Sequence, residues 1–85
     1  MHQIKVGDKG VLNYVLALQE HFKENNTVEM VARGHAIDRL IQAVLIYENV
    51  FSTEPEKLTL SNEVHLDVID NGFTSVMVMR IDKRD

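Results

Sequence analysis

Two short segments carry the residues that are best suited to bind an anion. Lys9 precedes Gly10, Arg33 precedes Gly34, and an apolar pattern typical of a helix follows each glycine. A glycine lets a ligand approach the backbone closely, and the start of a helix offers amide donors and a partial positive charge. The two segments therefore predict binding sites for phosphate groups, provided that the fold brings them to one face.

The neighbours of these two cations leave an alternative open. Lys9 has the setting of an ordinary solvated loop residue, and Glu29 and Asp38 lie close enough in the sequence to pair with Arg33. Exposed ion pairs of this kind contribute little energy and carry no function of their own. In that case neither cation would be dedicated to a ligand.

Other ionisable residues lie near the two cations in the sequence. Lys5 and Arg39 would extend a basic patch. His35 would strengthen anion binding when it is protonated, because histidine changes its charge near neutral pH. Arg80 is expected to pair with Glu63 across a hairpin and is therefore not counted with the site.

No arrangement of residues indicates catalysis or a metal centre. The chain has no Walker loop, no HExxH, no GxSxG and no cysteine. His65 lies between Glu63 and Asp67, but metal ligands usually converge from different elements of the fold. We therefore expect no enzyme activity, no cofactor and no metal.

Length and composition restrict the class of protein. The 85 residues allow one domain, residues 1–85, and an apolar content of 45% is that of a globular protein. The chain has no apolar run near the roughly 18 residues that span a bilayer, and its N-terminus lacks the apolar core of a signal peptide. We expect a soluble cytoplasmic protein with no membrane partner. The net charge of −4 counts against nonspecific binding of polyanions.

Hydrophobic periodicity predicts the elements that position these residues. Alternation indicates strands at residues 4–6, 27–32 and 58–68, and apolar residues at three- and four-residue steps indicate helices at about 11–22 and 36–51. A last strand follows a turn at 70–72. The order β-α-β-α-β-β predicts an α/β two-layer sandwich, a mixed four-stranded sheet with two helices on one face.

A two-residue turn at Asn71-Gly72 sets the expected hairpin register, with Ile69 opposite Thr74 and a bend at residues 61–63. In this register one face of the hairpin is apolar and is expected to be buried: Val64, Leu66, Val68, Met77 and Met79.

The second helix has more apolar residues than one packed stripe requires, which suggests a second contact surface. A small domain has little material to cover both sides of a helix, so a subunit interface is favoured over a deeply buried helix in a monomer.

Three stretches together resemble the Alba family of small archaeal chromatin and RNA-binding proteins. Residues 6–17 (VGDKGVLNYVLA) resemble a strand end, a basic loop and a helix start with the pattern VMNYVLA. Residues 32–37 (ARGHAI) are similar to the pattern ARGRAI, and residues 46–51 (IYENVF) are similar to the helix end EIVRNRF. The resemblance covers residues 4–51 best.

The resemblance implies a homodimer that binds DNA or RNA with little sequence preference and is associated with the chromosome. It implies contacts to nucleic acid in the loop after the first strand and at the start of the second helix: Lys9, Gly10, Tyr14, Arg33, Gly34 and His35. It also implies contacts between subunits or between dimers along and at the end of the second helix: Leu40, Val44, Tyr47, Asn49 and Phe51. The helical spacing of Tyr14 itself favours a packing role over base stacking.

Several positions depart from the family pattern. Asp8 replaces a loop lysine, His35 replaces an arginine, and Glu48 and Val50 replace the arginines that flank Asn49. The long arginine-rich arm of the family is shortened here to the turn at residues 70–72. These changes favour RNA or a duplex bound with modest affinity. They also leave open an interaction module that has lost nucleic-acid binding and pairs with itself or with a basic paralogue.

Overall fold

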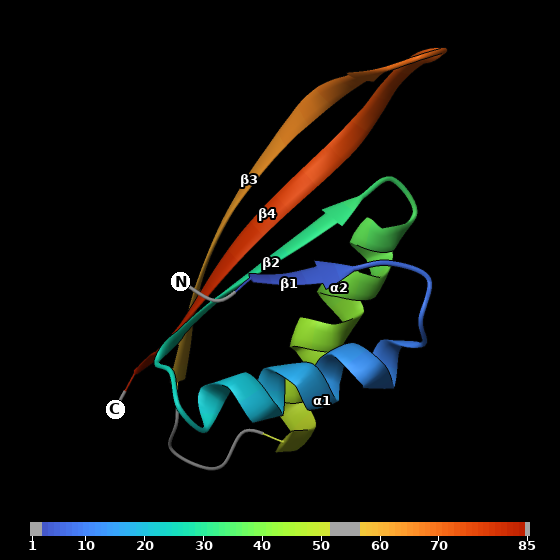
Figure 1. Cartoon of the computed structure of the whole chain (residues 1–85). Helices are drawn as coiled ribbons and strands as arrows, with labels where there is room; N and C mark the ends of the chain where they lie inside the picture. The colour runs from blue at the N-terminus through green and yellow to red at the C-terminus, as the bar shows by residue number, and fades with distance from the viewer. Residues whose placement is uncertain (1–2, 52–56, 85) are drawn as a thin grey trace.

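The computed structural model describes residues 3–51 and 57–84, and over these ranges strands and helices follow one another in the order β-α-β-α-β-β (Figure 1). This is the order and the fold class that the sequence predicts. The elements are β1 (Gln3–Val6), α1 (Val11–Phe22), β2 (Thr27–Arg33), α2 (Ala36–Ile46), the π-helical turn η1 (Tyr47–Phe51), β3 (Lys57–Ile69) and β4 (Gly72–Arg84).

The strands form one mixed sheet in the order β1-β2-β4-β3, with both helices on the same face (Figure 1). β1 and β2 are parallel, and Val6 lies opposite Ala32, while β4 is antiparallel to both of its neighbours. Parallel strands end at the same edge of a sheet. The loop after β1 and the turn after β2 therefore leave the sheet side by side.

The core lies between the two helices and the inner strands. In α1 the buried stripe is Tyr14, Val15, Leu18 and Phe22, whose three- and four-residue steps are those of one helix face. Alternate residues of β2 are buried against this stripe and against α2: Val28, Met30 and Ala32. Each fully buried aliphatic side chain contributes about 1.5–3 kcal/mol relative to an exposed one, so this region carries most of the stability of the fold.

The second helix changes its winding before it ends. The α-helical bonding stops at Ile46, and η1 continues the same helix as a π turn, where the sequence predicts an unbroken α-helix to Phe51. Tyr47 stays in the core, with its ring centroid 5.4 Å from that of Phe22. The predicted end of the helix and bend at residues 52–56 lie outside the described residues.

The register and the turn of the β3–β4 hairpin differ from those that the sequence predicts. Ile69 lies opposite Gly72, not Thr74, so Asp70 and Asn71 are the two turn residues. The positive φ falls on Gly72, at 144°, and Asn71 does not adopt one. The pairing from Ile69 back to Lys57 is continuous, so the bend expected at residues 61–63 is absent.

The outer part of the hairpin leaves the body of the protein (Figure 1). Each of its strands has 13 residues, and β4 pairs with β2 only as far as Val76, opposite Arg33. The expectation that the arm is reduced to its turn is therefore wrong in length, although the arm contains no arginine between residues 61 and 79.

One face of the hairpin is apolar as predicted but is not buried. Val64, Leu66 and Val68 share the helix side of the sheet and are 56%, 65% and 79% exposed. The two helices pack on β1 and β2 and do not extend over this part of β3 (Figure 1). The prediction of a buried hairpin face is wrong because alternation indicates a face without indicating what covers it.

Candidate nucleic-acid interface

The loop between β1 and α1, residues 7–10, is held by one tyrosine. The hydroxyl of Tyr14 accepts hydrogen bonds from the backbone N–H groups of Gly7, at 2.7 Å, and Lys9, at 3.2 Å. Tyr14 is only 6% exposed because its ring belongs to the buried stripe of α1. It cannot stack on a base, and its contribution to the loop is to fix the backbone that presents Lys9.

The turn between β2 and α2 is held by the backbone of β4. Gly34 adopts a φ of +51°, and its N–H donates to the carbonyl oxygen of Ser75 at 2.8 Å. Residues that carry a Cβ rarely adopt this backbone conformation, because their Cβ comes too close to the neighbouring backbone atoms. Glycine is therefore required here, and Arg33 is fixed at the point where β2 ends.

The two segments lie at the same edge of the sheet, as the register of β1 and β2 requires (Figure 1). Arg39, from the second turn of α2, links them: its Nη1 donates to the carbonyl oxygen of Gly7 at 3.1 Å. Arg39 thus has a structural contact and does not simply extend a basic patch.

Both helices begin without a side-chain cap. Gly10 and His35 occupy the N-cap positions of α1 and α2, and neither makes a side-chain capping hydrogen bond. Of the first amide groups, those of Asn13 and Ile37 donate to the carbonyl oxygens of Gly10 and Gly34. The others attract anions together with the helix dipole. These two helix starts can therefore accept an anion, although Asp38 in the first turn of α2 opposes one there.

Lys9 and Lys5 are the cations available at this edge. Both are exposed, and in the described part of the chain neither makes an ion pair. Lys5 and Arg33 line an open hollow of about 340 Å³ on the sheet face opposite the helices. Asp8 is also exposed next to Lys9 and lowers the local positive potential.

Arg33 is paired, and its partner is neither of the two that the sequence suggests. Its Nη2 lies 2.6 Å from Oδ2 of Asp67 in β3. Asp67 is 34 residues away along the chain and reaches Arg33 across β4. No local pattern indicates this contact, which depends on the length and register of the hairpin.

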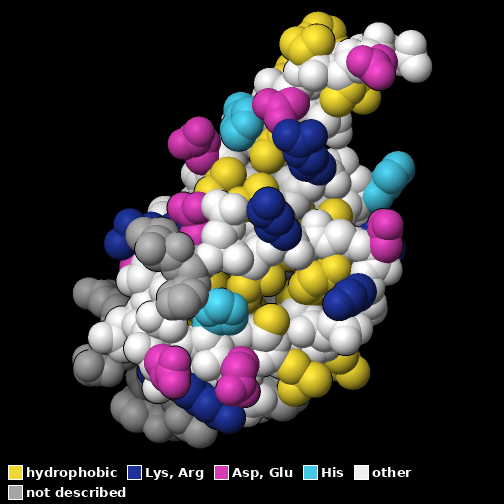
Figure 2. All heavy atoms as spheres, in the orientation of Figure 1, with side chains coloured by type: hydrophobic (Ala, Val, Ile, Leu, Met, Phe, Trp, Pro, Cys, Tyr) yellow, Lys and Arg dark blue, Asp and Glu magenta, His cyan; other side chains and the backbone are white. Residues whose placement is uncertain are grey.

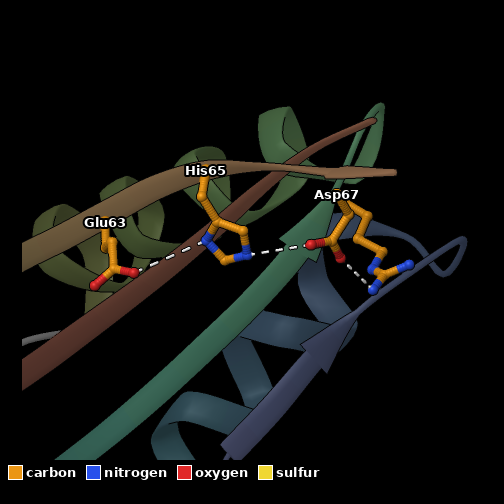
Figure 3. A network of polar contacts seen from close by, with 4 residues as sticks. Glu63, His65 and Asp67 are labelled. Atoms are coloured by element: carbon orange, nitrogen blue, oxygen red, sulfur yellow. Dashed lines mark hydrogen bonds and ion pairs between the residues drawn. The ribbon is translucent and has the colours of Figure 1, made fainter. Parts of the chain in front are cut away.

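Asp67 is the end of a row of ionisable residues on β3. Figure 3 shows Glu63, His65 and Asp67 projecting to the same side of the strand. His65 Nδ1 is 3.9 Å from Oε1 of Glu63, and its Nε2 is 3.5 Å from Oδ1 of Asp67. Over residues 3–51 and 57–84, no group of three or more histidine or acidic side chains is placed to hold a metal ion.

The surface mixes charges of both signs. On the face that Figure 2 shows, lysine and arginine side chains are separated by acidic and apolar ones, and the described residues there form no continuous basic patch. Arg80 lies opposite Ser61, not Glu63, and bonds to Asp82 with its Nε. The predicted pairing of Arg80 with Glu63 is wrong because the register differs.

The structure places most of the expected interface residues inside the chain. Leu40, Val44 and Tyr47 are at most 5% exposed, so they offer no surface to a second subunit. Asn49 is exposed, and its amide donates to the Leu45 carbonyl oxygen at 2.7 Å. The side chain of Phe51 is not among the side chains that the structure describes.

Exposed apolar side chains occur on the helical segments, namely Leu12, Leu16, Leu45 and Val50, and on the hairpin, among them Val64, Leu66, Val68 and Phe73. In the described part of the chain, no helix is long and apolar enough to cross a membrane.

Known proteins resemble this chain in sequence and in fold. The sequence model of the Alba family matches residues 2–62. The DNA/RNA-binding protein Alba of Methanoculleus marisnigri is 37% identical over 79 residues, which cover 89% of this chain and 85% of that protein. The DNA/RNA-binding protein Alba 2 of Methanopyrus kandleri is 43% identical over 54 residues, which cover 62% of this chain and 58% of that protein.

A solved structure, Alba from Thermoplasma volcanium, matches the fold with a TM-score of 0.70 at 23% identity. The match covers 99% of this chain and all of the solved one. At this level of identity the similarity concerns the fold alone.

Proposed function

This chain belongs to the Alba family, and we propose that it binds DNA or RNA with low sequence specificity through phosphate contacts at the β1–α1 loop and the start of α2. The family match at residues 2–62 includes both segments. The curated relatives are named as DNA/RNA-binding proteins, not as enzymes. The observation that carries the proposal is the position of two uncapped helix starts, each beside a cation, at one edge of the sheet.

The contacts available at this edge explain the low specificity. Lys9, Arg33 and the first amides of the two helices are donors that suit phosphate oxygens, and phosphates carry no sequence information. The projecting hairpin has no arginine with which to enter a groove. RNA or a duplex bound with modest affinity is therefore the ligand that we propose, in the cytoplasm or on the chromosome.

We further propose that a second copy of the chain covers the apolar face of the hairpin. This face is formed by Val64, Leu66, Val68 and Phe73, all of them more than half exposed. Next to it, at the start of α2, Ile37 and Ser75 line an open hollow of about 580 Å³. A monomer of this size gains much by burying such a patch, and a dimer would double the phosphate contacts of one particle.

Binding to labelled duplex DNA and duplex RNA, measured by fluorescence anisotropy at about 50 and 200 mM salt, tests the proposal. The double substitution Lys9→Ala/Arg33→Ala should weaken binding and lower the slope of log affinity against log salt by about 0.9 for each lost phosphate contact. Lys23→Ala is the matched control, since Lys23 is an exposed lysine at the opposite end of α1. An unchanged slope in the double variant would refute the proposed site.

Two observations favour a second candidate, an interaction module without nucleic-acid binding. Arg33 is already paired with Asp67, and the chain carries a net charge of −4. Such a module would form a homodimer, or a heterodimer in which a basic paralogue supplies the cations. A stable dimer in light scattering that binds neither duplex at about 50 mM salt would favour it.

A further inference from the structure

We propose that Asp67 competes with phosphate for Arg33, and that His65 weakens this competition when it is protonated. The inference concerns the regulation of the site and rests on the nucleic-acid-binding function proposed above. It makes the affinity of the site depend on a residue of the hairpin that does not itself bind the ligand.

The ion pair occupies the donor that a phosphate would use. Arg33 Nη2 lies 2.6 Å from Asp67 Oδ2, the short distance of a charge-assisted hydrogen bond. The Arg33 side chain is 62% exposed, so a ligand can reach it, and that of Asp67 is 33% exposed. A carboxylate and a phosphate are alternative partners for the same guanidinium. Phosphate must therefore displace Asp67 or share Arg33 with it.

His65 holds the other oxygen of the same carboxylate. Its Nε2 is 3.5 Å from Asp67 Oδ1, on the side of the carboxylate away from Arg33 (Figure 3). A protonated imidazole attracts Asp67 and adds a positive charge beside the site. The formal charge of Glu63, His65, Asp67 and Arg33 together changes from −1 to zero on this protonation. Both effects favour an anion at Arg33.

Among the described residues, the surrounding elements add no other charge in contact with Asp67. On the same sheet face, β4 contributes Thr74 and Val76 between Asp67 and Arg33, and neither is charged. On β2, Glu29 lies further along and accepts a hydrogen bond from Gln3 at 2.7 Å. The other charged groups described on this face are Glu63, which faces His65, Arg80, which lines a hollow with Glu63, and Lys5, which shares a hollow with Arg33.

The first test is a double-mutant cycle on RNA and DNA binding at about 50 mM salt. Asp67→Asn should tighten binding about fivefold, the upper range for the loss of an exposed ion pair. In an Arg33→Ala background the same substitution should not tighten binding, because the guanidinium for which Asp67 and phosphate compete has been removed. Glu63→Gln is the matched control, since it removes an equal charge from the same strand without touching Arg33. An equal gain in both backgrounds would overturn the proposal.

The second test varies the pH between 5.5 and 7.5. Wild-type affinity should rise toward pH 5.5, and His65→Gln should remove part of this rise. His21→Gln is the control, because His21 lies in the last turn of α1 and belongs neither to the hairpin nor to the proposed site. If His65→Gln keeps the full pH dependence, the role of His65 is refuted.

A third measurement separates failure of this inference from failure of the proposed function. The Arg33 side-chain nitrogen resonance, followed by NMR without nucleic acid, should shift in Asp67→Asn; an unchanged resonance means that the pair is absent in solution and overturns the inference. Titration with pyrophosphate, followed at the same resonance, should half-saturate at a concentration about five times lower in Asp67→Asn. This result would support the competition even if neither duplex bound, in which case only the proposed function would fail.

Discussion

The β1–α1 loop and the β2–α2 turn occupy equivalent places in the fold, yet their cations are in opposite electrostatic states. Both segments follow parallel strands at one edge of the sheet, and each places a cation beside a glycine. Lys9 makes no ion pair within the described ranges, whereas Arg33 is bound to Asp67. The fold decides where a cation is presented, and residues distant in the sequence decide whether it is available.

The two segments also differ in what fixes their backbone. A side-chain hydroxyl, that of Tyr14, holds the loop, while a main-chain bond from Gly34 to Ser75 holds the turn. Gly10 has an ordinary extended conformation, with φ −63° and ψ 154°, whereas Gly34 has a φ of +51°. Only the second glycine is required by its conformation.

The largest expected effect comes from this difference in conformation. Gly34→Ala should lower the free energy of unfolding by about 1–2 kcal/mol, because L-residues are strained at positive φ. The added Cβ would also lie 3.3 Å from Oγ1 of Thr74. Gly10→Ala is the control and should leave stability equal or slightly raised. Urea unfolding measures both, and equal losses in the two variants would contradict the comparison.

The next effect concerns the availability of the two cations. Lys9→Ala should weaken RNA binding about tenfold, the value of one charge-assisted phosphate contact. Arg33→Ala should weaken it less, about threefold, because Asp67 offsets Arg33. In an Asp67→Asn background the two losses should become similar. Anisotropy titrations of the four variants measure this, and a larger loss for Arg33→Ala in the wild-type background would reverse the ranking.

A smaller effect is expected where the loop is anchored. Tyr14→Phe keeps the ring in the core but removes the acceptor of two backbone N–H groups. We expect a loss of about 1 kcal/mol in stability, the net contribution of a hydrogen bond. Amide exchange at Gly7 and Lys9 should become faster, while exchange at Gly34 stays the same. Equal acceleration in both segments would show that they are not anchored independently.

The smallest effect lies at the other end of β2, where another carboxylate is paired. The Thr27 hydroxyl donates to Asp82 at 2.7 Å, and this bond, with the Arg80 guanidinium, lowers the pKa of Asp82 below its ordinary value of 3.8. The stability that this contributes is present above pH 3.8 and is lost as the pH falls through the lowered pKa. Asp82→Asn should flatten this part of the acid unfolding curve, and an unchanged curve would show that the pair contributes nothing.

Much of the fold follows from local patterns. The alternation around Met30 and the helical spacing of Leu18 predict the strands, the helices and their buried faces, because these patterns depend only on nearby residues. The register of the hairpin does not follow in this way. A shift of two residues keeps every side chain on its face, so alternation cannot distinguish Ile69 opposite Thr74 from Ile69 opposite Gly72.

The candidate site could be located from the sequence but not characterised. The glycines and cations at residues 9–10 and 33–34 indicate where an anion could bind. The pairing of Arg33 with Asp67 needs three strands in register, and the hydroxyl of Tyr14 reaches the loop only because α1 folds back on β1. Excess apolar residues in α2 predict a subunit interface on that helix. Leu40 and Val44 belong to the core of the single chain, whereas Leu45 is 49% exposed, so the interface stays a prediction.

The bond from Gly34 to Ser75 connects the turn that we propose to bind anions with the hairpin face that we propose to bind a second copy of the chain. Ser75 is opposite Leu66, a residue of the exposed apolar hairpin face, and the carbonyl oxygen of Ser75 accepts the hydrogen bond that holds the β2–α2 turn. A subunit that stiffens β4 would therefore stiffen the turn as well. Dimerisation and nucleic-acid binding would then show positive heterotropic linkage. Dilution below the dimer dissociation constant would therefore lower the nucleic-acid affinity of each protomer.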